Sequence, residues 1–356
     1  MSMLGDKKWF GIGLMVVAAT VLAACGAQAT EAPAVDEPEE LVPVNIRLSW
    51  LVKGEFVHVY MAKELGYYEE EGLDVTILEG SPDVTPMQFV VSGDDQFAYV
   101  ALDDVARGRS EGMPLIMTSS FLQINPSSIA SLAPLENNGP QDLVGKTIVD
   151  TPGGTLALIW DAFMRSQGLE PDDAELLVAD FGAKTPMFLE GDVELMATYE
   201  TNDAVQVEVG LGRDLNTWKI ADYGFNILAH GIVTSEQYKE DNPDVVRGMN
   251  RAVARAASWT VENPEEAARR LAALFVDVLG DSDLVSEDVT IRQVAETIKL
   301  YHTPNTLDEP CGWIAEADAE RTISLLFDNG GIENRDPVSA YYTNEFIDPD
   351  VSCPIP

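Results

Sequence analysis

The chain has 356 residues, of which 46% are hydrophobic, and its 60 acidic and 22 basic side chains give a formal net charge of −38. A chain this acidic lacks the basic footprint that a phosphate backbone requires, which excludes nucleic acid as a partner. The length suffices for two lobes with substantial cores. The acidity itself has two interpretations: a solvated surface that keeps the protein soluble, which we favour, or a preference for a cationic ligand.

The first residues have the features of a secretory signal. The charged Asp6-Lys7-Lys8 precedes an apolar run from Trp9 to Ala24, which is shorter than the roughly 20 residues of a membrane span. The run ends in Leu22-Ala23-Ala24-Cys25-Gly26, which is similar to a bacterial lipobox, although a signal peptide can also contain a cysteine by chance. We expect residues 1–24 to be a lipoprotein signal peptide and a lipid on Cys25 to anchor this extracytoplasmic protein to the cell membrane, on its periplasmic or outer face.

Residues 25–41 follow as a short acidic segment. They contain two prolines and few apolar side chains, so they cannot bury a core. We therefore expect a flexible tether between the lipid anchor and the body of the protein.

A first βαβ unit comes after the tether. Residues 45–50 read as a strand, residues 55–65 carry apolar side chains at helical spacing, and Gly72-Leu73 leads into a second strand over 74–78.

The unit is then repeated at an offset of about 100 residues, with a strand over 146–150, a helix over 156–164 and a strand over 175–178. Further landmarks recur in the same order, namely Thr85-Pro86-Met87 with Thr185-Pro186-Met187, and Gly93-Asp94 with Gly191-Asp192. Chance similarity does not easily place such landmarks in order, so we predict two homologous α/β lobes.

Two such lobes, set face to face, form a ligand cleft at the carboxyl ends of their strands. Helix N-termini at Gly153-Gly154-Thr155 and near Lys53-Gly54-Glu55 would offer N–H groups to an oxyanion or a carbonyl edge. We assign residues 42–133 and 235–356 to the first lobe and residues 134–234 to the second. Helices predicted after Ser235, over 243–262, 264–279, 289–301 and 316–329, are expected to pack around the first lobe and carry the hinge.

Three patterns resemble catalytic, phosphate-binding or metal motifs but have the wrong context. The segment 108–112 matches G-x-S-x-G, yet a predicted helix precedes it and a strand follows, the reverse of a nucleophile elbow. The segment 139–147 has five residues between its glycines and precedes a strand, unlike a phosphate-binding loop. The histidines, His58, His230 and His302, lack metal-ligand spacing. We therefore expect no metal, no cofactor and no catalytic residue.

Several segments resemble the NMT/THI-like solute-binding proteins of ABC importers, over almost all of residues 44–347. The first and last of them are the more specific, and the others are shared with sulfonate and nitrate binders. They are Leu48-Ser49-Trp50, the run from Tyr60 to Val75, Asp142 to Ile148, Asn242 to Val246, Asn263 to Ala267, and Tyr342 to Phe346. The resemblance implies a type II periplasmic-binding-protein fold, in which each of two lobes is a mixed sheet flanked by helices.

The group includes binders of thiamine pyrimidine precursors and binders of riboflavin. Pyrimidine binders of the group have Asn and His in the turn after the strand tryptophan, where this chain has Leu51 to Phe56. Segments 80–86, 215–216 and 222–224 are more similar to the riboflavin type. The resemblance therefore implies a flat aromatic vitamin, riboflavin ahead of an aminopyrimidine, with a small sulfonate or nitrate as a further alternative.

A flat aromatic ligand needs stacking partners and hydrogen bonds to its ring edge. The candidates for stacking are Trp50, Phe56, Tyr99 and Tyr199, and those for polar contacts are Asp104, Asn125, Glu200, Asn202, Gly154, Thr155 and His58. For each aromatic residue the alternative is core packing, and for His58 it is a structural role. Outside the lipidation site, we expect Cys311 and Cys353 to form a disulfide that ties the C-terminal tail to the body, the alternative being two buried thiols.

The favoured function is a monomeric binding protein that delivers its small-molecule ligand to an ABC permease. A pyrimidine synthase is the alternative from another class, since the family name also covers such an enzyme. The resemblance to that enzyme includes a cysteine-rich stretch, whereas this chain has no cysteine between residues 26 and 310. A surface lipoprotein that senses a ligand without a permease is a third possibility.

Overall fold

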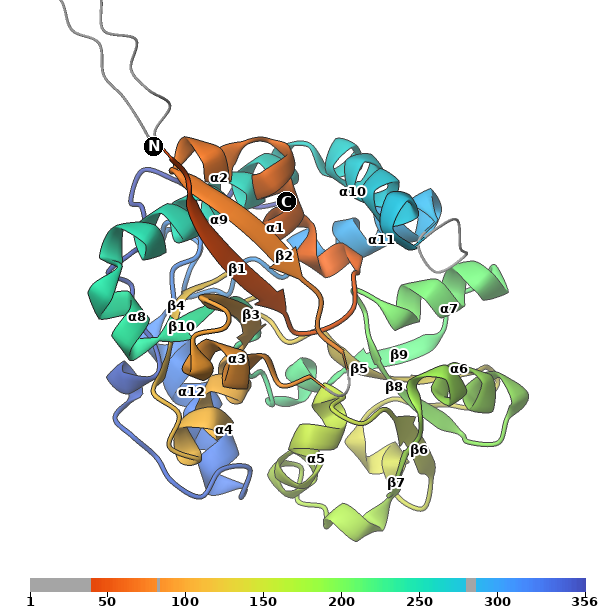
Figure 1. Cartoon of the computed structure of the whole chain (residues 1–356). Coiled ribbons are helices and arrows are strands. Elements are labelled where there is room, and N and C mark those ends of the chain that lie inside the picture. Colours follow the sequence, from red (N-terminus) through yellow and green to blue (C-terminus); the bar gives the residue numbers. More distant parts are fainter. Residues whose placement is uncertain (1–39, 82–83, 280–285) are drawn as a thin grey trace, which may run out of the picture. The chain divides into compact units, whose positions relative to one another are not determined.

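The computed structural model describes residues 40–81, 84–279 and 286–356, and Glu40 to Pro356 form one compact unit. The predicted signal peptide, the lipidated Cys25 and nearly all of the predicted tether lie outside the described residues. Figure 1 shows the compact unit with its two sheets and the helices that cover them. The predicted α/β fold of two mixed sheets flanked by helices is confirmed.

The first sheet has the strand order β2-β1-β3-β10-β4. The strands are β1 (Val42–Leu48), β2 (Leu73–Leu78), β3 (Phe97–Ala101), β4 (Leu115–Ser120) and β10 (His230–Ser235). The pairs β1–β2 and β1–β3 are parallel, whereas β10 runs antiparallel to both of its neighbours. Every residue of β3 and β4 is buried, as expected for strands with both faces covered.

The second sheet repeats this arrangement position for position, in the order β7-β6-β8-β5-β9. Its strands are β5 (Ser127–Ser131), β6 (Thr147–Asp150), β7 (Glu175–Val178), β8 (Leu195–Tyr199) and β9 (Asn216–Lys219). Here β5 is the antiparallel strand, between β8 and β9. The common order is what a duplicated βαβ unit predicts.

Several helices begin where the sequence places proline or a capping serine. Pro243 and Pro264 occupy the first turn of α9 and α10, and the Ser286 hydroxyl accepts the Val289 N–H at 3.4 Å to start α11. The prediction for α11 began two residues late because it started from the first apolar residue, Val289. The helices are α1 (Val57–Glu64), α2 (Tyr67–Glu70), α3 (Pro86–Ser92), α4 (Leu102–Ser110), α5 (Thr155–Ser166), α6 (Phe181–Glu190), α7 (Asp203–Leu211), α8 (Glu236–Asp241), α9 (Pro243–Glu262), α10 (Pro264–Leu279), α11 (Glu287–Ile298) and α12 (Glu316–Asp328).

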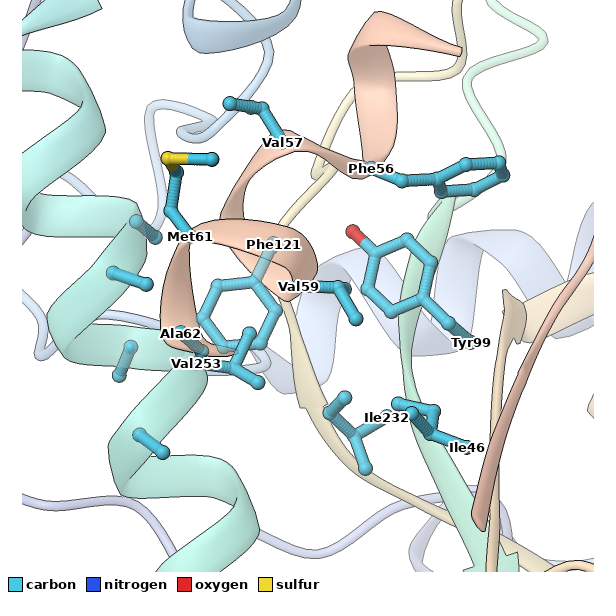
Figure 2. Packing of buried hydrophobic residues seen from close by; sticks show 14 of the residues in the cluster. Ile46, Phe56, Val57, Val59, Met61, Ala62, Tyr99, Phe121, Ile232 and Val253 are labelled. Carbon is cyan, nitrogen blue, oxygen red and sulfur yellow. The ribbon is translucent and has the colours of Figure 1, made fainter. Parts of the chain in front are cut away.

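The core of the first lobe lies between its sheet and the helices α1 and α9. Small side chains on the buried face of α9, such as Ala256 and Ala257, allow α1 to pack closely against it. Figure 2 shows Val253 of α9 close to Ala62 of α1, and Ile46 of β1 near Ile232 of β10. A helix that follows the second lobe in the sequence therefore covers strands of the first lobe, which lie nearly 200 residues earlier in the case of β1.

The chain passes between the two sheets through segments 121–126 and 220–229. The two segments are joined directly, because the Asn125 N–H donates to Asn226 Oδ1 at 3.1 Å. Because the strands before and after each segment belong to different sheets, we propose that these segments are the crossings between the lobes. Both predicted boundaries, at residues 133 and 235, would then move several residues toward the N-terminus.

The C-terminal helices contact more than the first lobe, which corrects the prediction. Helix α12 packs against both α4 and α5, and α11 packs against α7 of the second lobe. On α12, Thr322 Oγ1 accepts the Leu228 N–H at 2.7 Å and Arg321 donates to the Asn226 carbonyl at 3.1 Å. The second crossing is therefore held in place by α12.

The C-terminal tail is attached to the body by a disulfide between Cys311 and Cys353, whose Cα atoms are 4.8 Å apart. Backbone contacts accompany it, because the Cys311 N–H donates to the Val351 carbonyl at 2.8 Å and Pro310 pairs with Ser352.

We expect Cys311→Ser/Cys353→Ser to lower the free energy of unfolding by about 2 kcal/mol, because the bond closes a loop of intermediate length in the unfolded chain. The estimate is at the lower end of the usual range since the backbone contacts of the tail persist without the bond. Urea unfolding with and without reductant measures the effect. Equal stability of the two forms would contradict the prediction.

Within residues 40–81, 84–279 and 286–356, no helix combines the length and the apolar character that crossing a bilayer demands.

Candidate functional site

A cleft of about 990 Å³ lies where the strands of both sheets end. The segments after β1 and β6 and the ends of β3 and β8 line it, together with the first residues of β5 and β10. This is the location expected for a ligand site in open parallel sheets, because the strand carboxyl ends and helix N-termini meet there.

The structure brings six of the predicted ligand-binding residues to the wall of this cleft: Trp50, Asp104, Gly154, Thr155, Tyr199 and Asn202. Five others are absent from the described wall: Phe56, His58, Tyr99, Asn125 and Glu200. A role of any of these residues in binding stays a prediction.

Trp50 is a partly buried aromatic side chain on the first-lobe side of the cleft. Its ring meets that of Phe181, at the start of α6, edge to face with centroids 6.0 Å apart. The Trp50 carbonyl accepts the Gly80 N–H at 3.1 Å, and a Cβ on Gly80 would lie 2.4 Å from the Leu48 carbonyl oxygen. The absence of a side chain at residue 80 therefore fixes the turn that presents Trp50.

A buried ion pair forms the floor of the cleft beside Trp50. Lys53 Nζ lies 2.9 Å from Glu55 Oε1, and the two side chains are 5% and 0% exposed. Burial raises the pKa of Glu55, but the positive charges of Lys53 and His230 and the surrounding hydrogen bonds outweigh it, so the pKa lies below its ordinary value. Burial lowers the pKa of His230, whose Nε2 is 2.9 Å from Ser49 Oγ.

This floor is also connected to the second lobe. Thr201 Oγ1 donates to Glu55 Oε2 at 2.8 Å, and Lys53 Nζ lies 4.7 Å from the centre of the Tyr199 ring. Nearby, Gln293 of α11 accepts the Gly54 N–H at 2.9 Å and donates to Asn202 Oδ1 at 3.1 Å. The turn at residues 53–55 thus contributes side chains to the floor of the cleft. Its Gly54 N–H, which was expected to face a ligand, is instead hydrogen-bonded to Gln293.

A second charged cluster lies on the second-lobe side. Asp150, at the end of β6, accepts the N–H groups of Thr151 at 2.8 Å and Ala157 at 2.9 Å. Lys184 of α6 lies 3.7 Å from Asp150 and 2.7 Å from Asp203. Burial raises the pKa of Asp150, and Lys184 opposes this shift. For Lys184, burial lowers the pKa but the two carboxylates more than compensate, so the pKa is raised and the ammonium stays charged.

A third cluster lies on α4, where Arg107 bridges two carboxylates. Its guanidinium lies 2.7 Å from Asp103 and 2.5 Å from Asp104. Burial and the neighbouring Asp103 raise the pKa of Asp104 to about 6, although Arg107 lowers it. Asp104 therefore lines the cleft with a raised pKa and with Arg107 as its ion-pair partner.

Three predicted ligand-binding residues form a core layer behind the floor instead. His58 is fully buried, and its ring nitrogens lie 2.8 Å from the Tyr301 hydroxyl and 2.6 Å from the Tyr99 hydroxyl. Phe56 packs edge to face on Tyr99, as Figure 2 shows. Burial, and then the charge of His230, lower the pKa of His58 to about 3.

His58 makes stability depend on pH. Because its pKa is about 3 in the fold and 6.5 ordinarily, the unfolded chain binds the proton better. The contribution of His58 is complete above pH 6.5 and is lost as the pH falls toward 3. We expect His58→Gln to flatten the decline in unfolding free energy between pH 7 and pH 5 in urea titrations. The same change at the half-buried His302 is the control, and equal slopes for wild type and His58→Gln would contradict the prediction.

The remaining two predicted residues have other partners. Asn125 is buried in the first crossing, where its side chain accepts the Ser127 N–H at 2.8 Å. The Glu200 carboxylate lies 3.3 Å from Lys219 Nζ. Asn125 and Glu200 thus make structural contacts and are not among the residues that line the cleft.

Six residues in or directly behind the cleft wall were not predicted as ligand-binding residues. Five are charged, and Phe181 contacts Trp50 of the other lobe. They are Lys53, Glu55, Asp150, Phe181, Lys184 and Asp203. The turn at residues 53–55 was expected at the cleft, but for its backbone N–H groups rather than its side chains. Among the described residues, no three His, Cys, Asp or Glu side chains are grouped so that they could hold a metal ion. Ser110 of the G-x-S-x-G pattern ends α4 and accepts the Asn334 N–H at 3.3 Å.

Comparison with known proteins adds a family and a fold. Residues 53–267 match the model of the family described as NMT1/THI5 like. The chain is 28% identical over 264 residues to the formylaminopyrimidine-binding protein of Halalkalibacterium halodurans, covering 73% of this chain and 77% of that one. It is 26% identical over 324 residues to the riboflavin-binding protein RibY of Chloroflexus aurantiacus, covering 89% and 90%. A 4-amino-5-hydroxymethyl-2-methylpyrimidine phosphate synthase of Candida albicans is 25% identical, with 63% and 69% covered.

Solved structures share the fold at low sequence identity. The periplasmic aliphatic sulphonate binding protein SsuA of Escherichia coli superposes with a TM-score of 0.61 at 14% identity, covering 84% of this chain and 96% of that one. The periplasmic nitrate-binding protein NrtA of Synechocystis PCC 6803 gives 0.62 at 14% identity, covering 86% and 87%. The two-lobe periplasmic-binding-protein fold is therefore confirmed.

Proposed function

The chain belongs to the NMT1/THI5-like family, and we propose that it is a substrate-binding protein whose cleft captures a flat aromatic heterocycle, riboflavin in the first place. A relative that matches 89% of this chain is named a riboflavin-binding protein. We further propose that the loaded protein docks on an ABC permease and is held at the membrane by a lipid on Cys25, as a monomer.

The size of the cleft is the observation that carries the choice of ligand. Its volume of about 990 Å³ is at the upper end of the roughly 300–1,000 Å³ of small-molecule pockets. A three-ring flavin with its side chain uses such a volume, whereas a single pyrimidine ring leaves most of it to water. Trp50 and Phe181 offer ring faces and edges on both sides of the cleft, which suits an extended aromatic system.

An aminopyrimidine is the second candidate, and it is supported by the formylaminopyrimidine-binding relative. The two candidates share a need for stacking and for hydrogen bonds to ring nitrogens. They differ in size, so the loose fit of a single ring predicts weaker binding.

A synthase activity has less support than binding. Some family members are named as synthases. In this chain the cationic side chains of the described cleft wall, Lys53, Arg107 and Lys184, are held in ion pairs. The buried His58 is held by two tyrosine hydroxyls and does not line the cleft. These features support selective binding rather than turnover.

The experiment is a titration of the purified protein with riboflavin, thiamine, the aminopyrimidine precursor, taurine and nitrate, followed by thermal shift and tryptophan fluorescence. Riboflavin is expected to raise the melting temperature saturably and to quench the fluorescence of Trp50. Saturation by the aminopyrimidine alone would transfer the assignment to the second candidate. Binding of neither vitamin would remove the proposed ligand class.

A further inference from the structure

The N-terminus of α5 opens into the cleft, and a carboxylate of the chain itself lies there. Asp150 accepts the N–H of Ala157, in the first turn of α5, at 2.9 Å and that of Thr151 at 2.8 Å. Gly154, just before α5, makes room for it, because a Cβ at that residue would lie 2.4 Å from Asp150 Oδ1. The N–H of Ala157, in the first turn of α5, and that of Thr151 are therefore not free to bind an external anion.

The nearest cation is neutralised by the same arrangement. Lys184 Nζ lies between Asp150 and Asp203, at 3.7 Å and 2.7 Å, and its side chain is 10% exposed. An arriving anion would meet two carboxylates for this one ammonium group. The second-lobe wall therefore has no spare positive charge near α5 in the part of the chain that the structure describes.

The other two cations of the described wall are compensated as well. Lys53 is paired with Glu55, and Arg107 is paired with both Asp103 and Asp104. In the described part of the chain, three cationic side chains line the cleft, and six carboxylates lie in or directly behind its wall. The carboxylates are Glu55, Asp103, Asp104, Glu111, Asp150 and Asp203. A surplus of carboxylates over cations around the cleft disfavours a negatively charged ligand.

We propose that this cleft selects an uncharged ligand and that Asp150 is the specificity-determining residue that excludes oxyanions from the N-terminus of α5. The inference rests on the proposed function, because it refines the ligand class of the same cleft. It would separate this chain from the proteins of the same fold that are named as sulphonate and nitrate binders, because Asp150 occupies N–H groups at the start of α5 that an anion would need.

The test measures binding of sulfate, nitrate and taurine to the purified protein by thermal shift and calorimetry. Wild type is expected to show no saturable binding at millimolar concentrations. Asp150→Ala removes the internal carboxylate, leaves Lys184 with one partner and frees two N–H groups, so at least one of the anions is expected to bind about tenfold or more tightly than to wild type.

Two further variants make the comparison sharp. Asp161→Ala removes one exposed carboxylate from the same helix, away from the cleft, and is expected to leave anion binding unchanged. Asp150→Asn keeps the shape of the side chain without its charge and replaces the alanine variant if that variant does not fold.

Saturable anion binding by wild type, or no gain in either Asp150 variant, would overturn the inference. Riboflavin is titrated in parallel, and its result bears on the proposed function alone. A protein that binds neither riboflavin nor the aminopyrimidine, but gains an anion on loss of Asp150, would refute the proposed ligand and support the role of Asp150.

Discussion

Trp50→Ala is expected to weaken riboflavin binding by about thirtyfold to a hundredfold, the loss typical of a central aromatic contact. Trp50 is partly buried, lines the cleft and meets Phe181 from the opposite lobe. Because the ring is only partly buried, truncation should lower the melting temperature only slightly. Calorimetry gives the affinity, and thermal unfolding gives the stability.

Two controls accompany this variant. Trp50→Phe retains a ring for stacking and should recover much of the affinity, whereas Trp259→Ala removes a tryptophan of α9 that does not line the cleft. Unchanged affinity with a large loss of stability would make Trp50 a core residue. Tyr199→Ala is a less clean probe, because the Tyr199 hydroxyl bonds to Thr155 and its ring lies under Lys53.

Glu55→Gln is expected to lower the free energy of unfolding by about 3 kcal/mol, the loss typical of breaking a buried ion pair. Lys53 is only 5% exposed, and without Glu55 its charge would have no counterion at 2.9 Å. The double variant Lys53→Met/Glu55→Gln removes both charges and should recover most of the loss. Urea unfolding of wild type, Glu55→Gln, Lys53→Met and the double variant gives the coupling energy.

The pH dependence of this pair has a definite sign. The folded pKa of Glu55 lies below the ordinary 4.5, so its contribution to stability is complete above that pH and is lost as the pH falls through the folded value. The double variant should therefore lose less stability than wild type below pH 4.5. Additive effects of the two single changes would show that Lys53 and Glu55 do not depend on each other.

The elements of the fold were largely predictable because their signals are local. Pro243 and Pro264 mark helix starts, and the repeated landmarks indicate two sheets of common order. The start of α11 required recognition of Ser286 as a cap. The packing of α12 on both lobes could not be predicted, because an amphipathic helix shows that one face is buried but not against which partner.

The candidate site was less predictable, for two physical reasons. All five residues of β3 are buried, so polarity could not show that Tyr99 faces the core rather than the cleft. The bond from Thr201 to Glu55 and the contact of Phe181 with Trp50 join residues far apart in the sequence. A single sequence gives no sign of such pairs, whereas Trp50, Gly154 and Asn202 were found from their positions after strands or at helix starts.

Gln293 touches both lobes at once, through Gly54 on one side and Asn202 on the other. Together with the bond from Thr201 to Glu55, it bridges the lobes beside the ligand cleft. Separation of the two lobes would break both bridges. On the proposed function, these bonds would add to the barrier that a bound ligand meets on leaving, although Gln293, Thr201 and Glu55 do not themselves line the cleft.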